Sequence, residues 1–164
     1  MTGEWITRLA VDERKRDDMR SRITESAARK ANLVAAHGQR LLDELRTTIV
    51  RDIGTFHNEF PEDLSREILF EDLDHDGGFT VRKPEFPNAA LSIVPHLLAA
   101  SFNCQYRFTS ANGLPPREDR LEFMFTGNGD DGLQIKHPGT GQVFTNADDL
   151  SEYLLAPVFT GRPR

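Results

Sequence analysis

The feature that most constrains this chain is an apolar stripe in its first third. Within residues 27–60, apolar side chains recur every three or four positions: Ala27, Ala31, Val34, Leu41, Leu45, Ile49, Ile53, Phe56 and Phe60. This spacing places them on one face of an α-helix. Charged residues fall between them and face water, among them Arg40, Asp43, Glu44, Arg46, Arg51 and Asp52. We expect a helix whose apolar face covers a sheet built from the rest of the chain.

The expected helix is too long to lie entirely against a domain of this size. No proline occurs before Pro61, and good helix formers dominate the first sixty residues. Roughly 55 helical residues span on the order of 80 Å. The diameter of a domain of about 100 residues is much smaller, roughly twice a radius of gyration of about 13 Å. The helix therefore either breaks near Gly38 or projects and meets a partner. We divide the chain into a helical arm, residues 1–35, as a possible oligomerisation element, and a single α+β domain, residues 36–164.

The arm is densely charged with both signs. Acids precede bases by four positions at Asp12 and Arg16, Asp18 and Arg22, and Glu25 and Arg29. Each such pair stabilises a helix by about 0.2–0.5 kcal/mol, so a solvated helix face explains the pattern. The alternative is a basic patch for nucleic acid or membrane, made of Arg14, Lys15, Arg16, Arg20 and Arg22. Asp17 and Asp18 dilute the field of that patch, which disfavours this alternative.

Two apolar residues at the start of the arm indicate a different role. Trp5 and Leu9 lie four positions apart and are separated from the later stripe by charged residues. A contact with a second copy of the chain, or a fold-back onto the same chain, would cover them. We favour self-association, which makes a homo-oligomer the expected assembly.

From residue 68 onward the apolar period changes to two. Residues 101–109 alternate strictly, and residues 121–126 do the same, which is typical of half-buried strands. Turns at 127–132 and 137–141 precede further short strands, and connections this short permit only neighbouring antiparallel strands. Residues 87–100, with Pro95 among them, fit either a strand or a helical turn. A short closing helix is expected from a cap at Thr145 or Asn146 until just before Pro157.

The predicted fold class is therefore α+β. A long N-terminal helix, or a helical hairpin, packs on an antiparallel β-meander of four to six strands, and the short C-terminal helix completes the cover of that face.

The strongest local motif is the sequence DLDHDG at residues 72–77. It resembles the opening of an EF-hand calcium loop, in which Asp72, Asp74 and Asp76 would converge on a hard cation. The resemblance covers about twelve residues and departs at the twelfth, where Lys83 stands in place of the bidentate glutamate. The competing interpretation is a β-hairpin with strands at 68–70 and 79–83. The acids between the strands would then be explained by their turn propensity and solubility.

No arrangement typical of catalysis is found in the sequence. The five histidines lack metal-ligand spacing, and no phosphate loop or nucleophile elbow occurs. Cys104 alternates in phase with Phe102 and Tyr106, which favours a buried thiol over a nucleophile. The chain shows no enzyme signature, although residues brought together only by folding could still form a site.

Net charge and composition limit the partners and the compartment that we expect for this chain. Residues 61–164 carry 9 Lys/Arg against 16 Asp/Glu, which argues against nucleic-acid binding by that part. There is no secretory apolar region near the start and no apolar run near the ~20 residues of a membrane span, so no membrane partner is expected. A single cysteine indicates no disulfide framework. We expect a cytoplasmic protein.

Three functional hypotheses remain open on the sequence. The first is a non-enzymatic interaction or scaffold protein that self-associates through its N-terminal helix. The second is a calcium-responsive module that uses Asp72, Asp74 and Asp76. The third is a small-molecule-binding or catalytic α+β domain with a pocket between helix and sheet.

Overall fold

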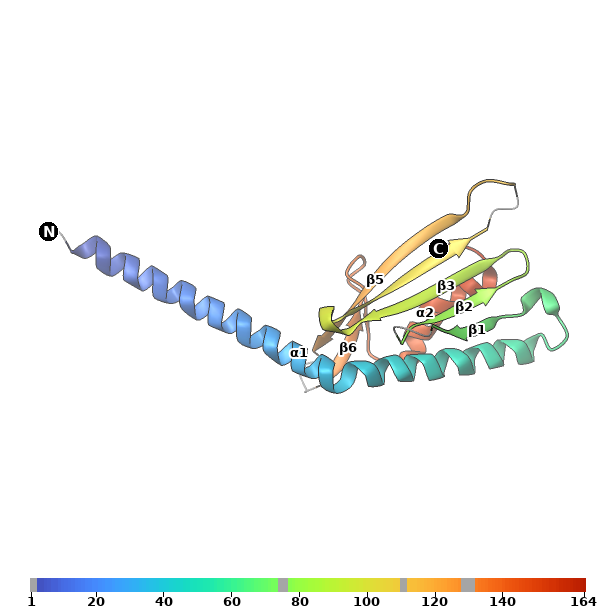
Figure 1. The fold of residues 1–164 in the computed structure, drawn as a ribbon, viewed down its shortest axis with the longest axis horizontal. Coiled ribbons are helices and arrows are strands. Elements are labelled where there is room, and N and C mark those ends of the chain that lie inside the picture. The colour runs from blue at the N-terminus through green and yellow to red at the C-terminus, as the bar shows by residue number, and fades with distance from the viewer. Residues whose placement is uncertain (1–2, 74–76, 110–111, 128–131) are drawn as a thin grey trace.

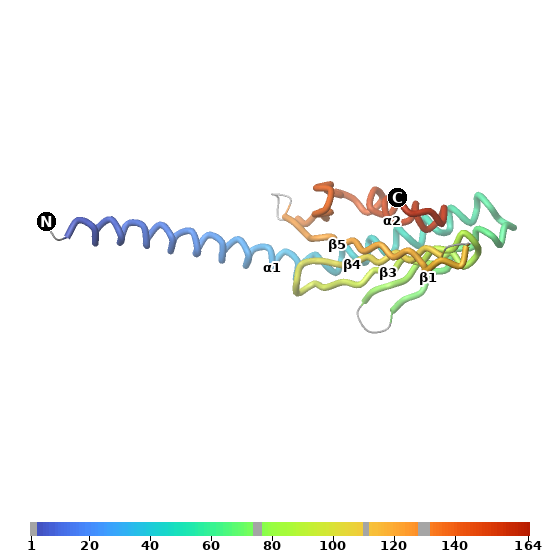
Figure 2. Tube along the Cα trace, turned by 90° about the horizontal axis from the view of Figure 1, so that it is seen from above, coloured from blue at the N-terminus to red at the C-terminus, as the bar shows by residue number. Residues whose placement is uncertain are grey.

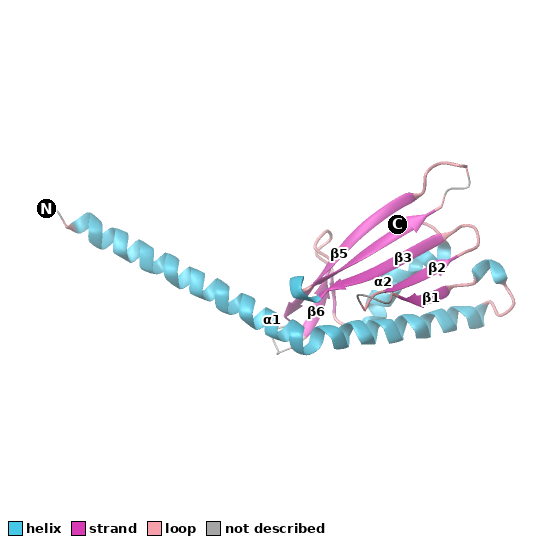
Figure 3. Ribbon diagram, in the orientation of Figure 1, coloured by secondary structure: helices cyan, strands magenta, loops and turns pink. Residues whose placement is uncertain are grey.

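The chain begins with one long helix and continues as a sheet closed by a second helix. A computed structural model describes residues 3–73, 77–109, 112–127 and 132–164. Their elements are α1 (Glu4–Glu59), the 3-10 turn η1 (Leu64–Arg66), β1 (Leu69–Asp72), β2 (Phe79–Lys83), β3 (Ala89–His96), the 3-10 turn η2 (Leu97–Ala99), β4 (Ser101–Phe108), β5 (Arg117–Gly127), β6 (Leu133–Lys136), β7 (Val143–Phe144) and α2 (Ala147–Thr160). The α+β class is confirmed (Figure 3).

The described strands form a single antiparallel sheet in the order β1-β2-β3-β4-β5-β6-β7. This meander was predicted, but with seven strands it exceeds the expected four to six. One added strand is β3, which occupies the ambiguous residues 87–100 and pairs with β4 from Ala89↔Phe108 to His96↔Ser101. Pro95 is tolerated because the pairing with β2 ends at Ile93, so Pro95 has a neighbouring strand on one side only.

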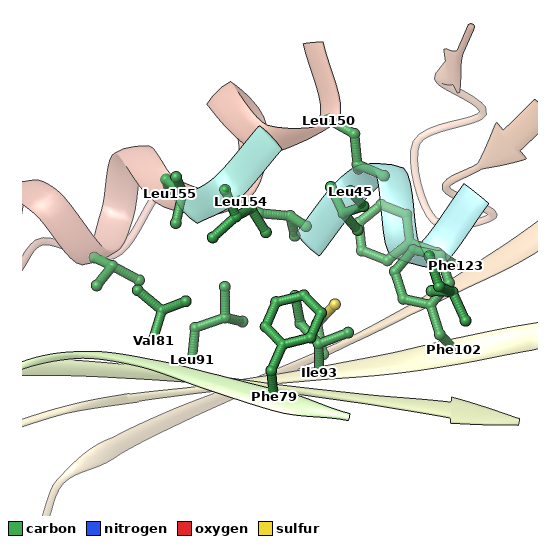
Figure 4. Close-up of a cluster of buried hydrophobic side chains, with 14 of the residues drawn as sticks. Leu45, Phe79, Val81, Leu91, Ile93, Phe102, Phe123, Leu150, Leu154 and Leu155 are labelled. Atoms are coloured by element: carbon green, nitrogen blue, oxygen red, sulfur yellow. The ribbon is translucent and has the colours of Figure 1, made fainter. Parts of the chain in front are cut away.

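One face of the sheet is covered by the second half of α1 and by α2 (Figure 2). The expected stripe supplies Leu45, Ile49 and Ile53 to this core, all of them buried. Figure 4 shows Leu45 of α1 and Leu154 of α2 packing on the row of side chains that rises from the sheet. The inward residues of the strands are Phe79, Val81, Leu91, Ile93, Phe102, Cys104, Phe123 and Phe125. The two ends of the stripe differ from the prediction, since Ala27 and Ala31 are exposed and Phe60 is 38% exposed.

Of the two alternatives for the long helix, a break near Gly38 does not occur, because α1 runs unbroken for 56 residues. The first part of α1 projects beyond the sheet as an isolated rod (Figure 1). This rod tilts toward the same side of the helix as the sheet. Gly38 instead permits a close approach of η2, since a Cβ there would lie 3.2 Å from Leu97 Cδ2. The glycine therefore marks the point where the domain meets the helix.

The C-terminal helix begins as predicted and ends later than predicted. Asn146 caps α2 by accepting a hydrogen bond from the backbone N–H of Asp149 at 2.8 Å. The helix was expected to stop before Pro157, and this was wrong, since it continues to Thr160. A proline removes the hydrogen bond to the carbonyl four residues earlier, here that of Tyr153. The Arg164 guanidinium donates to this carbonyl instead, and its charge lies 3.8 Å from the Tyr153 ring centroid.

Candidate interaction surface

The first half of α1 exposes apolar side chains that the described part of the chain does not cover. We call residues 4–32 the arm, because the first buried residue of the helix is Val34. Six large apolar side chains of the arm are between 41% and 67% exposed: Trp5, Ile6, Leu9, Val11, Met19 and Ile23. Large apolar side chains gathered on one side of a helix and left exposed make this arm a candidate interaction surface.

Five of these side chains lie on the side of the helix that faces the domain further along. Five turns of an α-helix take 18 residues, so residues that far apart point in the same direction. Trp5 and Ile23 are therefore aligned with Leu41, which packs against the core. Leu9 is aligned with the buried Leu45, and Ile6 with the buried Leu42. Met19 lies close to the same line. The apolar side of the arm thus continues the stripe that the sheet covers.

Val11 is the exception among the exposed apolar residues of the arm. It is aligned in the same way with Thr47, which is exposed on the outer side of α1. Val11 and Leu9 therefore point to different sides of the same turn of helix. This difference makes Val11 a matched control for Leu9.

Ion pairs within the helix stabilise the arm without burial. Arg16 Nη1 lies 2.8 Å from Glu13 Oε1, and Arg20 Nη1 lies 3.7 Å from Asp17 Oδ1. Both pairs are three residues apart and exposed, and each contributes a few tenths of a kcal/mol. Arg16 thus pairs with Glu13, three residues away, where the sequence predicted Asp12 at four, and the pair of Arg20 with Asp17 was not predicted. The arm is helical by local interactions, and its apolar side remains open.

The end of the domain nearest the arm is a shoulder formed by η2 and its neighbours. η2 lies directly over α1, and its Leu97 contacts the helix at Gly38. Leu98 is fully exposed. Leu33 is half-buried beside Gly127 at the end of β5, where a Cβ would lie 3.8 Å from Leu33 Cδ1. Figure 3 shows this short helical turn at the end of the strands from which the arm departs. Sequence reasoning missed Leu98, since residues 87–100 were ambiguous.

The hairpin interpretation of the DLDHDG motif is confirmed at both strands. β1 and β2 pair from Leu69↔Arg82 to Asp72↔Phe79. Asp72 ends β1 and its Oδ1 lies 3.5 Å from Arg46 Nη1 of α1. Asp74 and Asp76 lie outside the described residues, so the structure does not test the three-carboxylate site. Within the described ranges no group of three or more His, Cys, Asp or Glu side chains could hold a metal ion.

Lys83, which departs from the calcium-loop pattern, has a structural role. Its Nζ donates to the carbonyls of Glu85 and Pro87 at 2.9 and 3.1 Å and so fixes the connection between β2 and β3. Burial, and secondarily the nearby Arg66, lowers the pKa of Lys83. Lys83 also lines an open pocket of about 450 Å³ at the far end of the domain, together with Phe60, Arg66, Phe86 and Arg162.

The cavity where the two helices meet the sheet is small. The cavity bounded by α1, β6 and α2 measures about 40 Å³, which holds no more than a few water molecules. Cys104 is buried in the sheet, as predicted, and burial raises the pKa of its thiol, so it is protonated at neutral pH. The buried His137 accepts a hydrogen bond at Nδ1 from the backbone N–H of Thr140 and packs edge-on against Phe123.

Comparison with known proteins identifies no relative. No family model, no curated protein and no solved structure matches the chain. Among the described helices, none has the length and hydropathy that crossing a membrane requires. The physical properties of the surfaces are therefore the basis for a functional assignment.

Proposed function

We propose that this chain is a non-enzymatic interaction protein that self-associates through its N-terminal helix. The observation that carries the proposal is the row of exposed apolar side chains Trp5, Leu9, Met19 and Ile23 on one side of the arm. Isolated helices are marginally stable in water, and in proteins an apolar side is normally covered by packing. A second copy of the chain would supply that cover.

The size of the apolar surface suits a reversible assembly. Full burial of a large apolar side chain contributes about 1.5–3 kcal/mol, and the exposed side chains on the apolar side of the arm, Val11 excluded, retain about half of their surface for a partner. Two arms together would gain on the order of 10 kcal/mol. Association costs an estimated 4–15 kcal/mol, so the gain and the cost are of the same order. We expect an equilibrium that shifts with protein concentration in the micromolar range.

The test is sedimentation equilibrium on the full chain from about 1 to 100 µM. The expected mass rises from 18.5 kDa toward twice that value. Leu9→Ser should keep the chain at the lower mass over most of this range, whereas Val11→Ser, on the other side of the same turn, should behave as the parent. A monomer at 100 µM for the parent chain would refute self-association.

Two other functions stay predictions. The calcium module depends on Asp72, Asp74 and Asp76, and a calorimetric titration without heat at millimolar calcium would remove it. A small-molecule site has little room in the cavity of about 40 Å³ between the helices and the sheet, whereas the open far-end pocket is large enough to hold one. Its three cations, Arg66, Lys83 and Arg162, would suit an anionic ligand.

A further inference from the structure

The side of α1 on which the domain lies restricts how two arms can pair. The apolar side of the arm and the core side of the same helix point in one direction, as the alignment of Leu9 with Leu45 requires. In a parallel pair each arm would present this side to the other. Each domain would then project toward the partner at the same level, and the two domains would occupy the same space. An antiparallel pair places the domains at opposite ends and avoids the overlap.

The length of the arm fixes the extent of an antiparallel overlap. The partner helix can follow the apolar side from the tip of the arm until the domain begins, where Lys30 and Leu33 become half-buried. These roughly 26 residues span about 40 Å at 1.5 Å per residue. In that overlap the tip of one arm reaches the level of the shoulder of the other copy.

The shoulder offers an apolar surface at that level. Leu98 is fully exposed there, and Leu33 and Leu97 lie beside it on α1 and η2. The net charges of the two parts are opposite in sign. Residues 1–35 carry 8 Lys/Arg against 6 Asp/Glu, and residues 36–164 carry 12 against 20. An arm that lies against the domain of another copy therefore gains long-range attraction as well as apolar contact.

We propose that two copies pair with their arms antiparallel, and that the tip of each arm, residues Trp5, Ile6 and Leu9, docks on the Leu98 shoulder of the other copy. This inference rests on the proposed self-association and adds its orientation and its second contact surface. The partner is a second copy of this chain.

The contact surface is tested with a matched pair of leucines. Leu98→Glu replaces the exposed leucine of η2, and Leu64→Glu replaces the exposed leucine of η1 at the opposite end of the domain. Trp5 is the only tryptophan, so its emission reports on the tip of the arm alone. We expect the parent emission to shift to the blue with concentration, Leu98→Glu to raise the dissociation constant at least tenfold, and Leu64→Glu to change it less than twofold. Equal effects of both substitutions would overturn the docking site.

Orientation is tested by distances between spin labels in the full chain. Labels at Asp17→Cys, near the middle of the arm, should lie close to each other across the pair, at about the 10 Å separation of packed helices plus the label tethers. Labels at Arg8→Cys should be about 27 Å further apart along the axis, because position 8 of one copy aligns with position 26 of the other, about 18 residues from that copy's own position 8. The buried Cys104 should stay unlabelled, which labelling of the parent chain checks.

The possible outcomes separate the two proposals. Short distances at both positions would indicate parallel arms and would overturn the antiparallel inference while leaving self-association intact. Long distances at both would show that the arms do not pair along their length, and would also overturn it. Absence of any dipolar coupling at 100 µM would overturn self-association itself. A short distance at 17 with a long distance at 8 supports the inference.

Discussion

The two halves of α1 are a single continuous helix in opposite environments. In residues 41–59 the stripe meets the sheet and α2, and Leu45 and Ile49 are completely buried. In residues 4–32 the same side of the helix is exposed, and short-range ion pairs such as Arg16 with Glu13 take the place of packing. Continuity of a helix therefore does not imply a uniform origin of its stability. The domain half is stabilised by burial, and the arm half by local pairs and helix propensity.

The residues on the stripe explain why only one half is buried. In the domain half the stripe is uninterrupted, with Leu41, Leu45 and Ile49 in succession. In the arm the corresponding line passes through Asp12 and Arg16 between its apolar residues. A domain core has no water with which such charges could interact, whereas the edge of a helix pair leaves them partly solvated. The arm is suited to a partial, reversible contact.

The largest expected difference between the halves comes from the same substitution at two isoleucines. Ile49→Asp places an unpaired carboxylate where the native side chain is 0% exposed, and we expect a loss of several kcal/mol that unfolds the domain. Ile23→Asp, at a position 67% exposed, should change the free energy of unfolding of the monomer by about 0.5 kcal/mol or less. Urea unfolding followed by circular dichroism at low micromolar concentration measures both. A folded Ile49→Asp domain with unchanged stability would contradict the packing.

A second substitution, in the domain, tests whether the stability of the domain and the association of the arm are independent. The buried Tyr106 hydroxyl donates a hydrogen bond to the carbonyl of Leu154 and so ties β4 to α2. Tyr106→Phe removes this hydrogen bond but leaves the carbonyl its donor within α2, and we expect a loss of about 0.5–1.5 kcal/mol. Thermal unfolding should show the loss, while the concentration dependence of Trp5 emission should stay that of the parent chain. A change in the association of the arm would show that the halves are coupled.

Alkaline pH should destabilise the domain without acting through the arm. Burial raises the pKa of the Cys104 thiol and of the Tyr106 phenol above their usual values. Both groups therefore stay protonated in the folded state after they would ionise in the unfolded chain, above about pH 8.5 and 10 respectively. The free energy of unfolding should fall with rising pH by up to about 1.4 kcal/mol per unit for each group. Cys104→Ala should remove the decrease between pH 8.5 and 10, measured by urea unfolding under reducing conditions.

The smallest expected effect lies in the arm. Glu13→Gln removes the partner of Arg16, and an exposed pair three residues apart is worth about 0.2–0.5 kcal/mol. Amide hydrogen exchange in residues 4–32 should therefore increase by no more than about twofold, with no change in residues 41–59. Slower exchange in the arm of the variant would contradict a stabilising ion pair.

The fold was predictable where one apolar period dominates. The stripe through Leu45 and Ile49 and the alternation around Cys104 each identified an element and its buried side. The prediction was wrong where a distant residue replaces a local interaction: α2 passes Pro157 because Arg164 satisfies the carbonyl that the proline leaves free. It was incomplete at β3, where the effect of Pro95 depends on where the neighbouring strand stops.

The candidate surface was predictable in part. Trp5 and Leu9 were identified because charged residues separate them from the stripe, which is visible in sequence. Leu98 was not identified, since its exposure depends on the turn η2 that follows β3 and on the contact of Leu97 with α1. The pairing of Asp72 with Arg46 also joins residues far apart in the chain, and no local pattern indicates it.

The ends of the meander have a consequence for how copies of this chain meet. An unpaired outer strand can act as a template on which another chain adds, and long flat strands lead in that way to fibrils. The outer strands here, β1 and β7, are four and two residues long, and β1 carries the acids Glu71 and Asp72. Edge strands this short offer an incoming strand few backbone groups to hydrogen-bond, and the acids of β1 add charge repulsion at that edge. Growth by sheet extension is therefore disfavoured, so the pair proposed above would not extend into a fibril through its sheet edges.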